Sequence, residues 1–492
     1  MKGKELTLRY PLNSFGFNNL NTAESKEVIS ETLVEISGNT PRNQAEIHTL
    51  GGVPVGQARV KKALTFSLCD GIFANAMIAL TDTFSVAAAI YLKAPAVAIA
   101  MLGSLPLLLS SFGQFFLPHI INPQKGRKLY VIRSTTMQSI FLAAVACSGW
   151  IPHQLNSWYY VTVLALAGFS GNLTSGLWIA WMGDLVPSQV RGRHFAWRNR
   201  IFSITQLFCA ISAGLLLRHY SSANAPWILF ASVFFTASFF RLVSTYFLSC
   251  QYEPVPSKKI QSVNTTKSPR IPGHFIYYSI ATALMQGAVA MAGPFFSVWY
   301  IRDLKFDYFT LSAVSAATVL GTIASLPLWG KLADTIGNRR VIMATGFMIS
   351  TVPLPYIISN HAWQIGFLNF YTGVCWSGYN LSNFNYLLLA AGLDNQDKKI
   401  SLSVAVTGIC VFAFSLLGGM VATRLPAIFG WQLLSLFLLS SLLRFLVFGG
   451  LFLNLPKYEP DSKPANIFHF IPGYRSTISK TLSLIKSRTK SL

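Results

Sequence analysis

The sequence predicts an all-α polytopic membrane protein with twelve transmembrane helices arranged as two pseudo-symmetric six-helix bundles. Hydrophobic residues make up 52% of the 492 residues and charged residues only 11%, whereas about 25% of a soluble domain is charged. The apolar residues form long runs, most of them close to the roughly 20 residues that span a hydrocarbon core. These runs cover residues 63–92, 95–121, 130–150, 157–182, 201–219, 226–250, 274–301, 307–330, 341–360, 363–391, 400–424 and 431–453.

The distribution of basic residues predicts how the helices are oriented. When the loops are assigned alternately to the two sides of a membrane, 31 of the 39 Lys and Arg residues lie on one side and 5 on the other, and three lie inside apolar runs. Basic residues stay cytoplasmic because their translocation is disfavoured. We therefore expect a multi-pass protein of the plasma membrane with both termini in the cytoplasm.

Composition also excludes several classes of function. The net charge of +22 would suit a nucleic-acid partner, but the basic residues are spread over the loops as topology requires, so membrane lipids are the expected charged partner instead. The six cysteines lie within or at the ends of apolar runs and the eight histidines are scattered. We therefore predict no metal, no cofactor and no enzymatic constellation. Residues 1–62 lack the apolar run of a signal peptide.

Five regions follow along the chain. Residues 1–62 are expected to form a largely disordered cytoplasmic arm because they are polar. Residues 63–250 and 274–453 form the two bundles, joined by a Pro-, Ser- and Lys-rich cytoplasmic linker at 251–273. Residues 454–492 form a basic cytoplasmic tail. Its end, 476–492, has an apolar face that suits a helix lying on the inner leaflet, and a solvated basic tail fits equally well.

The two halves of the chain echo each other. Arg241 is followed by the tripeptide Tyr-Glu-Pro at 252–254, and Arg444 is followed by the same tripeptide at 458–460. The two arginines are 203 positions apart. Such matches at similar membrane depth indicate a duplicated six-helix unit. Because substrate ligands usually differ between halves, we predict structural roles for both arginines.

Residues 330–340, GKLADTIGNRR, resemble the cytoplasmic signature of the major facilitator superfamily. The matching positions are Gly330, Leu332, Asp334, Gly337 and Arg339. By this resemblance the segment is a conformational latch that stabilises the outward-open state, with Gly337 allowing a tight turn and Asp334 placed near a helix N-terminus. The first-half copy keeps Gly, Arg and Lys at 126–128 but has Asn and Pro at 122–123, where the acidic residue is expected.

The resemblance implies a secondary active transporter that moves a small-molecule solute by alternating access. We expect a monomer in a bacterial inner membrane. No nucleotide-binding signature is present in the sequence, so ATP-driven transport by this chain alone is not expected. The fifth helix lacks the Gly- and Pro-rich pattern of the drug–proton antiporters in that superfamily, which disfavours drug efflux. The alternative hypothesis is a transporter-like sensor or scaffold that binds a ligand without net flux.

One polar stripe predicts where a solute binds. Asn369, Gly373, Trp376, Asn380 and Asn383 are spaced 4, 3, 4 and 3 residues apart, which places them on one face of the tenth helix. Buried unpaired amides are costly, so the stripe either faces a cavity or supplies hydrogen bonds between helices. Neutral amides and tryptophan favour a polar uncharged solute. The other candidate cavity residues are Asn75, Asn172, Trp178 and Gln286, and Gly293-Pro294 is expected to kink or break the seventh helix.

The first helix carries two carboxylates, Asp70 and Asp82. An ionisable residue at membrane depth is a functional candidate by default. Either carboxylate could couple transport to protons if burial favours its neutral form. Two alternatives remain open at this point: Asp70 pairs with Arg241, and Asp82 is solvated near the outer end of the helix.

Overall fold

A computed structural model describes residues 46–48, 54–120, 126–185, 188–220, 227–253, 271–392 and 396–457. Within these ranges a short antiparallel hairpin, β1 (Glu46–His48) and β2 (Pro54–Gly56), precedes a protein built of helices. The arm before residue 46, linker residues 254–270 and the tail from residue 458, with its amphipathic segment, lie outside the described residues.

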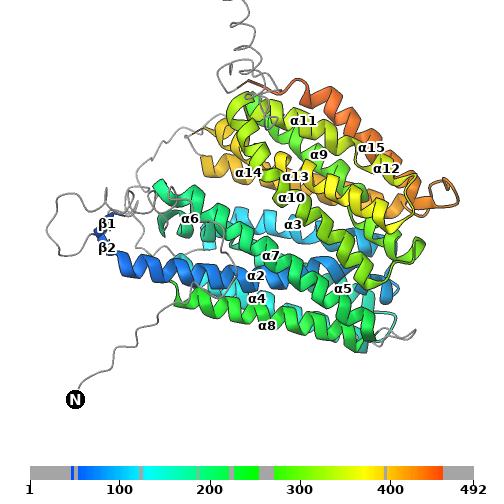
Figure 1. Ribbon diagram of the computed structural model, residues 1–492, viewed down its shortest axis with the longest axis horizontal. Helices are drawn as coiled ribbons and strands as arrows, with labels where there is room; N and C mark the ends of the chain where they lie inside the picture. Colours follow the sequence, from blue (N-terminus) through cyan, green and yellow to red (C-terminus); the bar gives the residue numbers. More distant parts are fainter. Residues whose placement is uncertain are drawn as a thin grey trace, which may run out of the picture.

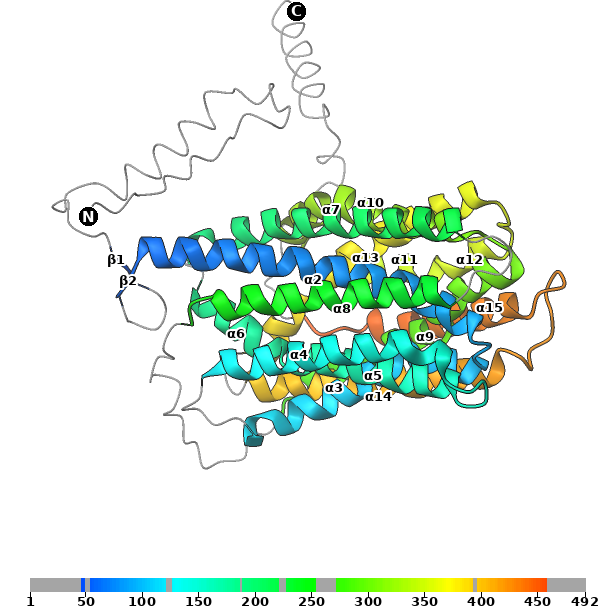
Figure 2. The ribbon, with the colours of Figure 1, turned by 90° about the horizontal axis from the view of Figure 1, so that it is seen from below.

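All twelve predicted segments are helical, and they form two bundles (Figures 1 and 2). The first bundle contains α2 (Gln57–Tyr91), α3 (Ala96–Ile120), α4 (Arg127–Ala146), η2 (Cys147–Trp150), α5 (Asn156–Leu173), α6 (Ser175–Leu185), α7 (Ser188–Tyr220) and α8 (Ile228–Cys250). The second bundle contains α9 (Gly273–Val298), η4 (Trp299–Asp303), α10 (Tyr308–Ile336), α11 (Asn338–Thr351), α12 (Pro353–Tyr356), α13 (Ala362–Ala391), α14 (Gln396–Val421), α15 (Gln432–Val447) and η5 (Phe448–Phe452).

Ten helices in the described part of the chain are long and apolar enough to cross a membrane. The predicted segments outside this set are 341–360 and 363–391. The first is divided into α11, of 14 residues, and α12, of four residues, at a proline, which cannot donate the backbone hydrogen bond that a continuous helix needs. The second, α13, has 30 residues, but its amides lower its apolar content.

Large apolar side chains cover the outside of both bundles. Ile140, Phe208 and Phe239 in the first bundle are each more than 60% exposed, as are Phe367 and Leu446 in the second. Exposed apolar surface of this extent marks contact with an apolar environment. The chain is therefore a multi-pass membrane protein, as the sequence predicts.

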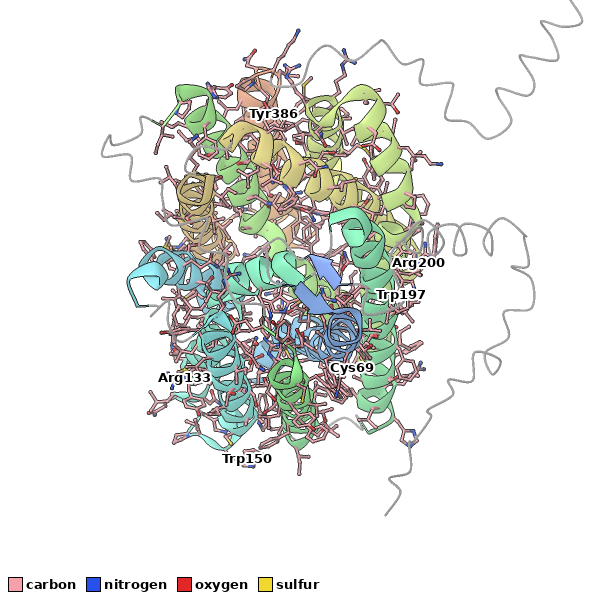
Figure 3. The ribbon with its side chains drawn as sticks, turned by 90° about the vertical axis from the view of Figure 1, so that its left-hand side faces the viewer. Cys69, Arg133, Trp150, Trp197, Arg200 and Tyr386 are labelled. Atoms are coloured by element: carbon pink, nitrogen blue, oxygen red, sulfur yellow. The ribbon has the colours of Figure 1, made fainter. Side chains whose placement is uncertain are left out.

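Each bundle is held together by its own helix pairs. In the first bundle α2 packs against α7 and α8, and α4 packs against α5 and α8; in the second α10 packs against α13, and α9 against α14 and α15. Figure 3 looks along the helices and shows Cys69 in the first bundle and Tyr386 in the second. The α10–α13 contact is very close: a Cβ added at Gly373 would lie 2.0 Å from the Thr318 carbonyl oxygen. Only glycine allows the two backbones to approach in this way.

The two bundles meet along α3 with α14 and along α7 with α10. Serine hydroxyls cross the first of these contacts: Ser415 Oγ donates to the carbonyl of Ala100 at 2.7 Å, and Ser111 Oγ donates to the carbonyl of Val404 at 3.3 Å. These hydrogen bonds satisfy the hydroxyls in an apolar surrounding. The bundles are thus joined by polar contacts as well as by apolar packing.

We call the end where α2 and α4 begin the basic end, and the end where α2 finishes and α10 starts the opposite end. At the opposite end Arg218 Nε of α7 lies 3.2 Å from Asp307 Oδ2, at the start of α10. The rings of Phe230 and Tyr308, from α8 and α10, are 5.5 Å apart and perpendicular. These contacts hold the two bundles together at the opposite end.

Two helices differ from the sequence expectation. The fourth predicted segment is interrupted at Thr174, between α5 and α6, although nothing in the local sequence, which has no proline there, indicates a break. The seventh segment shows the reverse: α9 continues through Gly293-Pro294 to Val298 without a break. The interruption at Thr174 matters because it lies on the wall of a cavity.

Candidate functional site

The structure contains two neighbouring cavities. The smaller one lies inside the first bundle, and the larger one lies between the two bundles. The smaller cavity, about 190 Å³, is enclosed by α2, α4, α5, α6, α7 and α8. The larger cavity, about 620 Å³, is lined by α2, α3, α4, α5 and α8 and also by Gly293, Pro294 and Ser297 of α9, from the second bundle. Gly171 and Arg241 line both cavities, so the two spaces adjoin.

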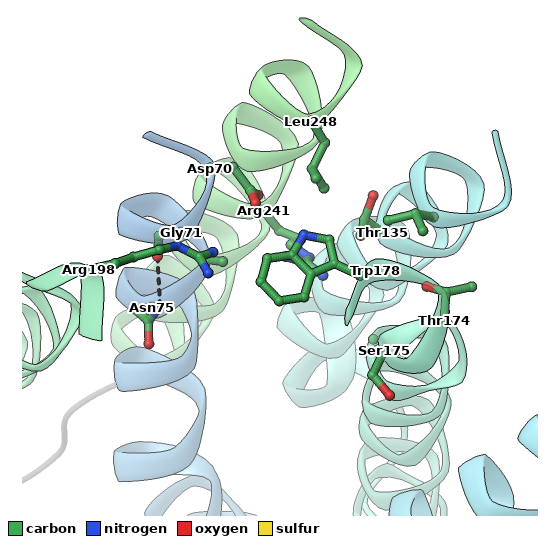
Figure 4. Close-up of a pocket in the computed structure, with 13 residues that line it drawn as sticks. Asp70, Gly71, Asn75, Thr135, Thr174, Ser175, Trp178, Arg198, Arg241 and Leu248 are labelled. Atoms are coloured by element: carbon green, nitrogen blue, oxygen red, sulfur yellow. Dashed lines mark hydrogen bonds between the residues drawn. The ribbon is translucent and has the colours of Figure 1, made fainter. Parts of the chain in front are cut away.

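A carboxylate and a guanidinium that line the smaller cavity share the hydroxyl of a buried serine. Ser244 Oγ donates to Asp70 Oδ1 at 2.6 Å and accepts from Arg241 Nη1 at 3.2 Å. Asp70 is 4% and Arg241 is 9% exposed, so both charges are removed from bulk water. The structure thus places Asp70 beside Arg241 (Figure 4). The Ser244 hydroxyl links the two side chains.

A second arginine enters the same cavity from α7. The Arg198 guanidinium lies 4.7 Å from the ring centre of Trp178 and 4.6 Å from that of Phe202. Figure 4 shows Arg198 and Trp178 reaching toward each other from opposite walls. Cation–π contacts of this kind strengthen when water is excluded, and Arg198 is only 5% exposed. The two rings therefore fix the position of this positive charge.

The predicted cavity residues of the first bundle are divided between the two spaces. Asn75 lines the smaller cavity, where its Nδ2 donates to the Gly71 carbonyl at 2.7 Å and its Oδ1 accepts from Gln206 at 2.8 Å. Asn172 and Asp82 line the larger cavity, and both side chains are exposed on its wall. Asn75 and Asp82 thus lie in adjoining cavities.

A third cavity, about 430 Å³, lies mainly within the second bundle. Gln286 and Asn383 line it together with hydroxyl-bearing residues of α9 and α14. The Tyr278 hydroxyl donates to Asn383 Oδ1 at 2.6 Å. The groups around this cavity are neutral, so its polarity comes from amides and hydroxyls, in contrast with the charged groups of the smaller cavity.

The remaining residues of the α13 stripe lie outside these three cavities. The Asn369 amide bonds across helices: it donates to the Tyr300 hydroxyl at 3.2 Å and accepts from Thr318 Oγ1 at 3.0 Å. Trp376 packs at 5.6 Å, edge to face, on Tyr379. The Asn380 side chain is exposed. The stripe therefore combines an interhelical bond, a packed ring, an exposed amide and one cavity residue.

Known proteins resemble this chain in sequence and in fold. A family model described as Major Facilitator Superfamily matches residues 278–488. The fold is similar to that of a D-xylose–proton symporter, with a TM-score of 0.59 and 13% sequence identity, over 83% of this chain and all of that one. The second half of the chain is thus similar in sequence to the major facilitator superfamily, and the fold of the described residues is that of these solved transporters. A nucleoside transporter, NupG, of the same fold gives a TM-score of 0.57 at 11% identity, over 81% of this chain and 99% of that one.

Curated relatives in the superfamily match only part of the chain. The multidrug resistance protein MdtG of Salmonella arizonae is 24% identical over 262 residues, which is 51% of this chain and 60% of that protein. MdtG of Salmonella typhimurium is 25% identical over the same length. The chain thus spans less than two thirds of the length of the curated relatives it matches.

The superfamily signature lies at the basic end, between α10 and α11. Gly337 has a φ of 88° and separates the two helices. Arg339 Nε donates to the Leu455 carbonyl at 2.7 Å, beyond η5. Asp334 is exposed, and a Cβ at Gly330 would meet no atom within 4 Å. In this conformation the signature is tied to the end of the second bundle through Arg339.

In the first half of the chain a different acidic residue occupies the corresponding helix start. Glu253, from the linker, accepts hydrogen bonds from the backbone N–H groups of Arg127 at 2.6 Å and Lys128 at 3.2 Å. A carboxylate at a helix N-terminus satisfies unpaired donors and the positive end of the helix dipole. The Asn122-Pro123 pair lies outside the described residues.

The two repeated arginines have different surroundings. Arg444 Nη1 donates to the Ile349 carbonyl at 3.0 Å and its Nε donates to Ser440 Oγ at 3.1 Å. Arg241, in contrast, lies on the walls of two cavities. Its Nε is buried and has no hydrogen-bond partner among the described residues.

Sequence reasoning missed Arg198 and Ser244 as members of the site. Arg198 lies between the apolar runs 157–182 and 201–219, where the sequence predicts a loop, but α7 begins at Ser188 and carries this residue into the bundle. Ser244 had one usable signal, its position three residues after Arg241, which places the two side chains on one helix face. No group of three or more His, Cys, Asp or Glu residues that could hold a metal occurs in the part of the chain that the structure describes.

Proposed function

We propose that this protein is a secondary active transporter that moves a small solute across the membrane by alternating access. The observation that carries the proposal is the larger cavity, which both bundles line, together with the contacts that join the bundles at the opposite end. A site between two bundles that are closed at one end is what alternating access requires. We further propose that the basic end is cytoplasmic and that residues 251–273 link the two transport domains.

The similar proteins support transport rather than catalysis. Their names are those of a multidrug resistance protein, a D-xylose–proton symporter and a nucleoside transporter. These names point to different solutes, so they support a transporter without selecting a substrate. We propose a bacterial inner membrane as the location.

Proton coupling through Asp70 or Asp82 belongs to the same proposal. Asp70 is buried in a hydrogen-bonded network with two arginines nearby, and Asp82 faces the larger cavity. A carboxylate in such a place gains or loses its charge as its surroundings open to water. Protonation of Asp70 would remove the charged acceptor of Ser244 and would therefore loosen its connection to Arg241.

A cross-link at the opposite end tests alternating access. In a background with the six native cysteines replaced, Arg218→Cys with Asp307→Cys places two thiols across the bundle contact, whereas Arg302→Cys with Asp303→Cys places both beside each other in one bundle. Purified protein is reconstituted in liposomes that contain a pH dye, and glucose, uridine, benzoate or tetraphenylphosphonium is added under a pH gradient. We expect at least one solute to move, oxidation to stop its flux in the first pair, and reduction to restore it.

The outcomes separate the two hypotheses. Flux that continues in the cross-linked Arg218→Cys, Asp307→Cys protein would contradict alternating access through this contact. A solute that raises the melting temperature by binding to the folded protein, but that never crosses the membrane, would instead favour the sensor or scaffold hypothesis.

A further inference from the structure

The smaller cavity contains an arginine whose hydrogen-bonding capacity is incompletely used. Arg241 Nη1 donates to Ser244 Oγ, but Arg241 Nε is buried without a partner among the described residues. A guanidinium carries five N–H donors in a planar fork that matches a carboxylate or a phosphate. A buried donor without an acceptor is costly, so an incoming oxyanion would be stabilised here.

The charges around this cavity favour an anion. The smaller cavity is lined by two guanidinium groups, Arg198 and Arg241, and by one carboxylate, Asp70. The only other charged group on the wall of the adjoining larger cavity, among the described residues, is Asp82. Charges interact strongly where water is excluded. The smaller cavity is therefore positive while Asp70 is ionised, and more positive when it is protonated.

The second bundle offers an internal comparison. Arg444 occupies the equivalent place in the repeat. Its Nη1 donates to the Ile349 carbonyl and its Nε donates to Ser440 Oγ. It lines none of the three cavities. The Nε of Arg444 is thus bonded within the protein, whereas the buried Nε of Arg241 has no partner among the described residues and needs a different explanation.

We propose that the transported solute is a small amphipathic organic anion and that Arg241 binds its carboxylate or phosphate-type group. This inference rests on the transport function proposed above and names its substrate class. Ser244, which is fully buried, links Arg241 to Asp70: its hydroxyl accepts from Arg241 and donates to Asp70. The charge of Asp70 therefore competes with the anion for Arg241. Trp178, which lines the smaller cavity and contacts Arg198, supplies an apolar wall for the body of the solute.

Binding to the purified protein in a neutral maltoside detergent tests this proposal. The probes are benzoate and phenylphosphonate, with benzamide as the neutral isostere of benzoate and benzylammonium as the cation. We expect both anions to raise the melting temperature and to bind at least about tenfold more tightly than the other two probes, because charge-assisted bonds are the stronger ones. Isothermal titration calorimetry gives the dissociation constants.

Two substitutions at the site and one outside it complete the test. Arg241→Lys keeps the charge but loses the planar fork, and should weaken benzoate binding about tenfold. Arg444→Lys is the matched control in the second bundle and should keep the affinity of the parent. Asp70→Asn removes the competing charge and should strengthen benzoate binding about threefold or more; a gain of affinity cannot arise from misfolding.

Three results would overturn the proposal. The first is benzoate affinity in Arg241→Lys equal to that of the parent, and the second is a preference for benzylammonium. The third is a response to phosphatidylglycerol vesicles with none to either soluble anion, which would assign the site to a lipid head group. If benzoate binds in an Arg241-dependent way but is not transported, the transport proposal is rejected and the anion site stands. If a neutral or cationic solute is transported and Arg241→Lys leaves its flux unchanged, the anion proposal is rejected and transport stands.

Discussion

The two bundles place an arginine at the same point of their repeat and surround it with different groups. In the second bundle Arg444 is held by a backbone carbonyl and a serine, inside the protein core. In the first bundle Arg241 faces two cavities and reaches a carboxylate through Ser244. The sequence repeat predicts one role for both, and the contacts of Arg444 fit that role. This difference underlies our proposal that one copy serves the scaffold while the other binds a ligand.

The largest expected effect on stability comes from replacing one glycine in each bundle, Gly373 in the second and Gly171 in the first. A Cβ at Gly373 would meet backbone atoms of α10, with the Thr318 carbonyl oxygen at 2.0 Å, whereas a Cβ at Gly171 would meet the movable side chain of Gln138 at 2.3 Å. We expect Gly373→Ala to cost about 3 kcal/mol or more, and Gly171→Ala about 1 kcal/mol or less. Fluorescence-detected size exclusion after graded heating compares the two. Equal melting temperatures would show that α10 and α13 can separate without loss.

Replacing the arginines gives the next effect in size. Arg444→Gln leaves the Ile349 carbonyl and Ser440 without their partner, which should lower the free energy of unfolding by about 2–3 kcal/mol. Arg241→Gln removes a group that is already partly unbonded, and should cost about 1 kcal/mol. Thermal unfolding of both variants in the same detergent measures the difference. A larger loss for Arg241→Gln than for Arg444→Gln would assign the structural role to Arg241.

The smallest expected effect on stability distinguishes two asparagines of α13, Asn369 and Asn380. Asn369→Ala removes bonds to Tyr300 and Thr318, and should cost about 1–2 kcal/mol of stability. Asn380 is exposed, so Asn380→Ala should change stability by about 0.5 kcal/mol or less. The same melting measurement applies, with the transport assay alongside. Loss of flux in Asn380→Ala at unchanged stability would support the cavity interpretation of the stripe, and parental flux would count against it.

The sequence predicts the helices well because membrane-spanning segments are long and apolar and their hydrogen bonds are internal. It does not predict the interruption at Thr174, since no proline or charge marks that position. The site is harder to predict because it depends on which helix faces meet. Asn75 and Trp178 do line the smaller cavity, but Arg198 belongs to a segment whose basic residues look like an ordinary cytoplasmic loop, and Asn369 finds its partners on helices far away in sequence.

The ion pair that bridges the bundles at the opposite end is open to the surrounding medium, since the side chains of Arg218 and Asp307 are 59% and 38% exposed. Dissolved ions screen such a pair over a distance of about 8 Å at physiological ionic strength. If the salt concentration rises only on that side of the membrane, the Arg218–Asp307 ion pair is weakened, and contacts on the other side are unchanged. Under the alternating-access mechanism proposed above, we expect the balance between the two access states to shift with the ionic strength on that side of the membrane.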